Sequence, residues 1–207
     1  MTSYTVICTP PLDTREEAGK LIREAGRDPR AQHLPDFITL ALHTGCRKGE
    51  LLGLEWRRVN MKARLILLEG THTKAGKRRS VPINNTAHSA LMRRLKFRAQ
   101  HCPQTPWVFC HPDGTRVKNI HARGGFRTAC RRAGIENFRV HDLRHTCAAW
   151  LVTAGVPLAE VRDLLGHHTI AMTERYAHLA PENVRAAVGR LDSESRSGHV
   201  MEIISNG

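Results

Sequence analysis

The sequence predicts a mainly α-helical domain that carries a small antiparallel β-sheet (α+β). Helix-type patterns run through most of the 207 residues, and only one pair of segments has a strong strand pattern. Apolar residues make up 41% of the chain, which is enough to bury a core at this length. We expect a single domain over residues 1–207, with its core at about 12–191 and a loose tail at about 195–207.

Capping and turn signals predict three helices in the first part of the chain. Thr14-Arg-Glu-Glu17 has the spacing of a capping box and opens a helix that runs to about Gly26. A second helix follows Pro35 and ends near Gly45, because glycine lets the chain turn there. A third helix is predicted over 47–54.

The strand pattern belongs to one predicted hairpin. Residues 64–69 and 79–83 read as strands and flank the segment 73–77, where Gly76 permits a bend. The helical pattern then returns, with a short strand expected at 107–109. Further helices are predicted at about 86–100, 118–133, 141–153, 157–165, 169–179 and 181–191.

Positive charge is concentrated in the middle of the chain. The whole sequence has 32 Lys and Arg against 19 Asp and Glu, a net charge of +13. Residues 61–140 hold 17 basic and three acidic residues, whereas the remainder holds 15 basic and 16 acidic ones. This excess is too large for an ordinary solvated surface and indicates a face that meets phosphates. Only ten residues are aromatic, which favours contact with a duplex backbone over stacking on unpaired bases.

The same composition argues against other classes of protein. No apolar run approaches 18 residues, so no membrane span is predicted, and the first ten residues lack the charged leader of a secretory signal. The six cysteines form no C-x-x-C pair, which indicates reduced, partly buried thiols. We therefore expect a protein of a reducing compartment, the cytoplasm of a bacterium.

Two cationic side chains stand out before the middle of the chain. Arg47 begins a predicted helix, where backbone N–H groups also favour an anion, and Glu50 lies three residues further on as an alternative salt-bridge partner. Lys74 lies on the tip of the predicted hairpin, from which it can reach into a groove. The alternative for Lys74 is a lysine that only makes the turn soluble.

A histidine-rich segment follows in His141-Asp-Leu-Arg144-His145. Helical spacing brings both histidines and Arg144 to one side, and imidazole beside guanidinium suits proton transfer near a phosphate. The alternative is a zinc pair at i and i+4. It is disfavoured because Asp142 replaces the glutamate of H-E-x-x-H and Arg144 would repel the metal, so no metal ligand is predicted.

Tyr176 lies nine residues after His167, on a predicted amphipathic helix. A tyrosine in such a place usually packs against the core. Its phenol becomes a nucleophile when nearby cations stabilise the phenolate and the charge that develops on its target.

Together these residues resemble the tyrosine recombinase (phage integrase) family, whose catalytic domain carries R, K, H-x-x-R, H and Y in this order. The flanking words Thr44-Gly-x-Arg47, Thr73-Lys74 and His141-Asp-Leu-Arg144-His145 are also typical of the family. The resemblance extends over about residues 12–191. The six matching positions are Arg47, Lys74, His141, Arg144, His167 and Tyr176.

The resemblance implies phosphoryl transfer on DNA without metal, ATP or any cofactor. Tyr176 would attack a phosphodiester to form a 3′-phosphotyrosyl bond and release a 5′-hydroxyl, which later reverses the step. Arg47 and Arg144 would neutralise the charge that gathers on the non-bridging oxygens, because guanidinium groups stay protonated and donate in a fork.

The other matching positions would handle protons and hydrogen bonds. Lys74 would protonate the leaving 5′ oxygen, His141 would exchange a proton with the tyrosine, and His167 would bond to the phosphate. Glu50 and His145 are expected to contact the catalytic residues without touching the DNA. Glu50 would orient Arg47. Lys77, Arg78 and Arg79 are predicted to contact DNA.

Partners follow from the same resemblance. Double-stranded DNA is the expected substrate, bound by a homotetramer in which the helix at 181–191 packs on the neighbouring subunit, with DNA-bending accessory proteins and a location at the nucleoid. Most members also carry an N-terminal core-binding domain, which we expect to be absent from this chain because the catalytic-type pattern begins almost at once.

Two other functions are open on the sequence. The chain could be a catalytically idle DNA-binding fragment or regulator, which would agree with the expected absence of the core-binding domain. Residues 156–176 also superficially resemble a helix-turn-helix. A type IB topoisomerase would share the tyrosine nucleophile but would relax supercoils. The presence of all six catalytic-type residues favours the recombinase, since simple binding needs no tyrosine at that position.

Overall fold

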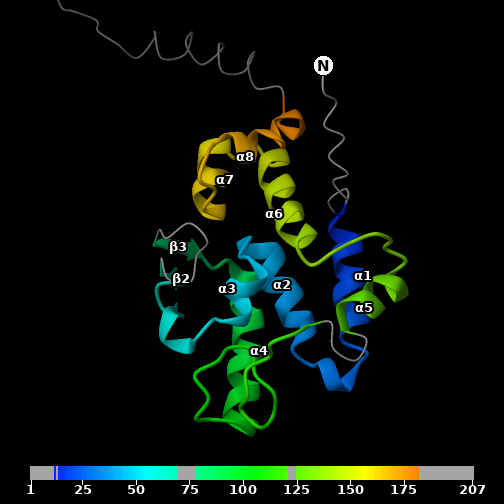
Figure 1. The fold of residues 1–207 in the computed structure, drawn as a ribbon, viewed down its shortest axis with the longest axis vertical. Helices are drawn as coiled ribbons and strands as arrows, with labels where there is room; N and C mark the ends of the chain where they lie inside the picture. Colours follow the sequence, from blue (N-terminus) through cyan, green and yellow to red (C-terminus); the bar gives the residue numbers. More distant parts are fainter. Residues whose placement is uncertain (1–11, 13, 70–77, 121–124, 182–207) are drawn as a thin grey trace, which may run out of the picture.

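The computed structural model describes residue 12 and residues 14–69, 78–120 and 125–181 (Figure 1). It is mainly helical with a three-stranded antiparallel sheet, which confirms the predicted fold class. The elements, in chain order, are α1 (Arg15–Ala25), η1 (Pro29–Ala31), α2 (Leu34–Thr44), α3 (Lys48–Leu52), η2 (Trp56–Arg58), β1 (Val59–Asn60), β2 (Leu65–Leu68), β3 (Arg79–Pro82), α4 (Asn85–His101), α5 (Gly125–Ala133), α6 (Asp142–Thr153), α7 (Leu158–Leu165), α8 (Ala171–Glu174) and η5 (Ala177–Leu179).

The predicted capping box begins α1. The hydroxyl oxygen of Thr14 accepts a hydrogen bond from the Glu17 backbone N–H at 3.1 Å, and the Glu17 carboxylate accepts one from the Thr14 N–H at 3.3 Å. Two backbone donors that the first turn leaves free are thereby satisfied. The helix packs against α5 and α2.

Helix α2 lies at the centre of the molecule and ends where the sequence predicts. Nearly every residue of α2 is buried, and the helix packs against α4 on one side and α6 on the other. At its end Gly45 adopts a left-handed conformation with φ of 62°. A β-carbon there would lie 2.5 Å from Cδ2 of Leu165, so the glycine allows the end of α2 to approach the end of α7.

The sheet has three short strands, and its edge strand β3 contacts α7. Strand β2 pairs with β1 on one side and β3 on the other, with Ile66 opposite Val81. The β2–β3 pair is the predicted hairpin, whose tip lies outside the described residues. Strand β1 was not predicted, because two residues carry no alternation pattern.

The apolar interior forms two clusters. The larger one is built from α1, α2, α4, α5 and the sheet. The smaller one, here the second cluster, joins α6 and α7 to Tyr176; its buried members are Ala148, Ala149, Val152, Val161, Leu165 and Tyr176. Figure 1 shows α6, α7 and α8 together at one end of the molecule and α4 toward the other. The second cluster therefore holds the tyrosine against α6 and α7.

In the middle of the chain, the structure differs from the sequence prediction at two elements. Of the helix expected over 118–133, the structure describes α5 from Gly125, and residues 118–120 are not helical. A β-carbon at Gly125 would lie 2.2 Å from the Ile120 carbonyl oxygen, which accepts a hydrogen bond from the N–H of Phe126. The prediction of a strand at 107–109 is wrong, because Trp107 forms only an isolated β-bridge with Glu55.

The predicted helix at 169–179 is broken into two short pieces. Helix α8 covers Ala171–Glu174 and η5 covers Ala177–Leu179, so Tyr176 lies between them as the residue that caps the second. The predicted helix at 181–191 and the tail lie outside the described residues, apart from Pro181.

The cysteines that the structure describes are buried free thiols, as predicted: Cys46, Cys102, Cys110, Cys130 and Cys147. Burial raises the pKa of Cys46 to about 11, so this thiol stays protonated at neutral pH. Within the described ranges, no helix is both long and apolar enough to cross a bilayer.

Candidate active site

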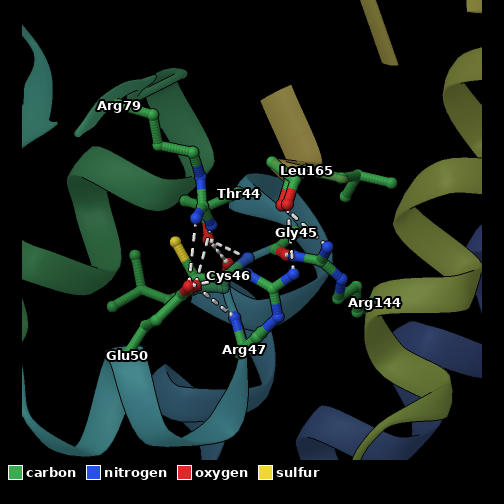
Figure 2. Close-up of polar contacts among 10 residues, drawn as sticks. Thr44, Gly45, Cys46, Arg47, Glu50, Arg79, Arg144 and Leu165 are labelled. Carbon is green, nitrogen blue, oxygen red and sulfur yellow. Dashed lines mark hydrogen bonds and ion pairs between the residues drawn. The ribbon is translucent and has the colours of Figure 1, made fainter. Parts of the chain in front are cut away.

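The site begins at Arg47, which caps α3, and Glu50 in the first turn of that helix (Figure 2). The Glu50 carboxylate accepts a hydrogen bond from the Arg47 backbone N–H at 2.7 Å and another from the Arg47 guanidinium at 3.0 Å. The capping geometry that starts the helix thus also fixes the direction of the arginine side chain.

Strand β3 supplies a second arginine to the same carboxylate. The two terminal nitrogens of Arg79 donate to the two oxygens of Glu50 at 3.0 and 2.8 Å, a two-pronged contact (Figure 2). The Arg79 side chain is 10% exposed and lies so close to Gly166 that a β-carbon there would come within 2.9 Å of it. Sequence reasoning assigned Arg79 to DNA; the structure places its guanidinium on Glu50.

Glu50 is the anion that holds these two cations together. Its side chain is only 2% exposed, and this burial by itself would raise the pKa of the carboxyl. The hydrogen bonds and charges of Arg79 and Arg47 outweigh burial, so the pKa lies below its ordinary value of 4.5. The carboxylate is therefore ionised at neutral pH.

Arg144 reaches the same place from α6. Its two terminal nitrogens donate to the backbone carbonyls of Gly45 and Leu165, each at 2.7 Å (Figure 2). Arg47 donates to the neighbouring carbonyl of Gly166 at 3.1 Å. The ends of α2 and α7 thus fix both guanidinium groups side by side.

The positive charges of Arg47 and Arg144 favour the binding of an anion between them. Burial, followed by the charge of Arg47, lowers the pKa of Arg144 to about 10, so both guanidinium groups remain charged at neutral pH. Among the described residues, the Arg144 guanidinium donates to the backbone carbonyls of Gly45 and Leu165, and these neutral acceptors leave most of its charge uncompensated. A phosphate placed between the two arginines would supply the missing negative charge.

His167 follows α7 and is tied to the tyrosine segment. Its Nδ1 lies 2.9 Å from the hydroxyl oxygen of Thr173, which is fully buried in α8. Burial and then the charges of Arg144 and Arg47 lower the pKa of His167 to about 4, so the ring is neutral at pH 7. Sequence reasoning missed Thr173, although its position three residues before Tyr176 was a usable signal.

Tyr176 is 7% exposed, and its hydroxyl is hydrogen-bonded to Nδ1 of His145. The sequence analysis predicts that His141 exchanges a proton with the tyrosine and that His145 has only a supporting role. In the structure the His141 ring packs edge-on against His145, with 4.7 Å between ring centroids. Burial and the charge of Arg144 lower the pKa of His141 as well.

Of the remaining predicted residues, the structure describes Arg78, which lies next to Arg79 at the start of β3. Arg78 is exposed and, with Arg79, Gly166 and His167, lines a hollow of about 450 Å³. Lys74 and Lys77 lie outside the described residues. A larger hollow of about 850 Å³ follows α5, but it is lined by none of the predicted site residues.

The described residues contain no group of three or more His, Cys, Asp or Glu side chains arranged to hold a metal ion. The two histidines considered as a zinc pair pack edge-on against each other, and His145 is hydrogen-bonded to Tyr176.

Residues 14–183 match the phage integrase family. The integrase of Salmonella phage P22 is 35% identical over 188 residues, which cover 86% of this chain and 46% of the relative. The tyrosine recombinase XerC of Corynebacterium glutamicum is 27% identical over 183 residues, covering 87% of this chain and 58% of the relative. The chain thus spans about half the length of the curated relatives it matches.

Solved structures show the same fold. The Tn1549 transposon integrase in complex with circular intermediate DNA superimposes with a TM-score of 0.70 at 25% identity, over 89% of this chain and 68% of that one. The catalytic domain of bacteriophage HP1 integrase superimposes with a TM-score of 0.65 at 24% identity, over 90% of this chain and 97% of that one. The chain belongs to the phage integrase family, and the residues described here form a tyrosine recombinase catalytic domain.

Proposed function

We propose that this chain is the catalytic domain of a site-specific DNA recombinase that cuts and rejoins strands through a 3′-phosphotyrosyl intermediate, without metal or ATP. The observation that carries the proposal is the meeting of two guanidinium groups at the ends of α2 and α7. Arg47 and Arg144 lie 97 positions apart in the sequence, yet they share this place with His167. Tyr176 is tied to it through Thr173 and α8.

The chemistry follows from where charge develops. The phenol oxygen of Tyr176 attacks the phosphorus, the bond to the 5′ oxygen breaks, and the phosphate stays joined to the tyrosine through its 3′ nucleotide. Arg47 and Arg144 donate to the non-bridging oxygens, which gather negative charge in the transition state. Lys74 gives a proton to the leaving 5′ oxygen. Attack by a 5′-hydroxyl of the partner strand reverses each step.

We propose that Glu50 and Arg79 position the catalytic Arg47 and do not contact the DNA themselves. The contacts of the Glu50 carboxylate with both arginines support a role in which Arg79 keeps the carboxylate in place and the carboxylate orients Arg47. Arg78 and Lys77, next to Arg79 in sequence, contact the DNA backbone.

Double-stranded DNA is the proposed partner, supported by the solved Tn1549 transposon integrase, which is in complex with circular intermediate DNA. We further propose a homotetramer on two DNA sites, with residues 181–191 packed on the neighbouring subunit, assisted by DNA-bending proteins at the bacterial nucleoid. Truncation after Leu179 tests the exchange of this segment, because it should reduce self-association on DNA.

Covalent capture tests the proposal directly. The chain is incubated in EDTA with a pool of nicked duplexes of randomised sequence, in which the fragment released by cleavage diffuses away and traps the adduct. We expect a protein–DNA adduct that survives denaturation in SDS and disappears with protease. DNA that is bound but never captured would support the DNA-binding alternative. Relaxation of supercoiled plasmid without pairing of sites would support a topoisomerase.

A further inference from the structure

We propose that His145 is a catalytic residue that accepts the phenol proton of Tyr176 as the tyrosine attacks DNA. The inference rests on the proposed function and specifies which of two neighbouring histidines acts on the nucleophile. The hydrogen bond between Nδ1 of His145 and the Tyr176 hydroxyl is the observation that carries it.

The fold holds both partners of this hydrogen bond in place. His145 stands in the first turns of α6, where the helix packs against α2 and α7. The ring of Tyr176 is buried in the second cluster between α6 and α7, so its hydroxyl end is directed by packing. The two ring centroids lie 6.0 Å apart with the rings tilted by 45°, which leaves the hydroxyl at the edge of the imidazole.

The protonation state of His145 suits an acceptor. Burial, followed by the charge of His141, lowers its pKa to about 4 against the opposing effect of Asp142. Arg175 beside the tyrosine and Arg144 also disfavour the charged ring. A neutral imidazole at pH 7 has one bare nitrogen, and a bare Nδ1 can take the phenol proton.

His141 occupies a different place. It precedes the first residue of α6 and is more exposed than His145, though still partly covered, and its ring meets His145 edge-on rather than standing between His145 and the tyrosine. The two histidines therefore have different roles. His145 takes the proton from the nucleophile, and His141 can bond to the DNA phosphate.

The proposed step balances without any further reactant. The O–H bond of Tyr176 breaks and its proton moves to Nδ1 of His145 while the phenol oxygen forms a bond to phosphorus. The bond from phosphorus to the 5′ oxygen breaks, and that oxygen takes a proton from Lys74. The buried carboxylate of Asp142, which acts to raise the pKa of His145, stabilises the imidazolium. On rejoining, His145 returns the proton to the phenol.

A spectroscopic experiment tests the contact without DNA. Nitrogen-15 NMR of the histidine rings, assigned with His145→Asn, reports which ring nitrogen carries hydrogen. We expect Nδ1 of His145 to be bare between pH 6 and 8, and Tyr176→Phe to shift its signal. A protonated Nδ1 over that range, or a signal that Tyr176→Phe leaves unmoved, would overturn the inference whether or not the chain cuts DNA.

Capture kinetics test the catalytic role, using the nicked duplex that the wild-type chain captures best. Asparagine keeps an acceptor near the position of Nδ1 but cannot take a proton, so His145→Asn should slow capture by about 10²–10⁴-fold. The matched control is His101→Asn, the same change at an exposed histidine at the far end of α4, which should leave the rate unchanged.

A sulfur-substituted substrate separates the two proton transfers. When sulfur replaces the bridging 5′ oxygen, the leaving group needs no proton, so the substrate should rescue Lys74→Ala. It should not rescue His145→Asn, because the phenol proton must still leave. Rescue of His145→Asn, or capture faster than wild type because the contact merely restrains Tyr176, would overturn the proposed role. A wild-type chain that captures no duplex would count against the proposed function instead, and the NMR result would still stand.

Discussion

Replacing Tyr176 with phenylalanine is expected to abolish covalent capture of DNA. Phenylalanine fills the same space in the second cluster, so the packing between α6 and α7 should survive, but it has no oxygen to attack phosphorus. The adduct should fall below detection with the nicked duplex, while non-covalent binding to the same duplex should stay within about threefold of wild type.

The sequence offers a matched control for this prediction. The chain has only two tyrosines, and Tyr4→Phe makes the same chemical change 172 positions before Tyr176 in the sequence. It should capture DNA at the wild-type rate. Capture by Tyr176→Phe at a comparable rate would contradict the assignment of the nucleophile, whereas loss of both capture and binding would point to a damaged fold.

Replacing Glu50 with glutamine is expected to produce the largest loss of stability among the site variants. The change removes the buried anion between two guanidinium groups and leaves their charges to repel each other. Removing one partner of a buried ion pair costs about 3–5 kcal/mol, and urea unfolding should show a loss at the lower end of that range because glutamine keeps some hydrogen bonding. Glu136→Gln, at an exposed position, is the control and should change the unfolding free energy by less than about 0.5 kcal/mol.

The loss should depend on pH in a defined direction. Because the folded pKa of Glu50 lies below its ordinary value of 4.5, the ionised carboxylate stabilises the fold above that value. This contribution is lost as the pH falls through the folded pKa. The difference in unfolding free energy between wild type and Glu50→Gln should therefore be full at pH 7 and shrink below about pH 4.5. A difference that stays constant down to the acid transition would contradict the ionised, arginine-paired state.

The same variant should impair catalysis beyond its effect on folding. Glu50 holds Arg47 from two sides, through the backbone N–H and through the guanidinium. A displacement of about 1 Å in a group that contacts the transition state can cost about 10²-fold in rate. Capture by the folded fraction of Glu50→Gln should fall by about that factor. An unchanged rate at a temperature where the variant is folded would show that Arg47 keeps its place without the carboxylate.

Local signals in the sequence were sufficient for the framework of the fold. The capping box at Thr14, the glycine that ends α2 and the hairpin strands all depend on residues close together in the chain. The contact between Arg47 and Glu50 was predictable for the same reason, because they lie three residues apart on one helix. Such features follow from backbone geometry and short-range hydrogen bonding.

Features that depend on tertiary contacts were missed. Arg79 looked like one more exposed cation of a basic segment, because its partner Glu50 lies 29 residues away. The break between α8 and η5 was hidden in a continuous helical pattern, and the close approach of Gly125 to Ile120 has no local signal in the sequence.

The choice between the two histidines could not be made from spacing. His141 and His145 lie on one side of the same helix, and either ring could have faced the tyrosine. The packing of the second cluster decides the matter, since it places the Tyr176 hydroxyl against His145.

Mapping the covalent adduct tests the central claim most directly. The captured complex is digested with nuclease and trypsin, and the peptide that retains a nucleotide is identified by mass spectrometry. We predict the peptide of residues 176–185, which begins with Tyr176, carrying a nucleotide through its 3′ phosphate. A nucleotide found on any other peptide, or joined through a 5′ phosphate, would contradict the account.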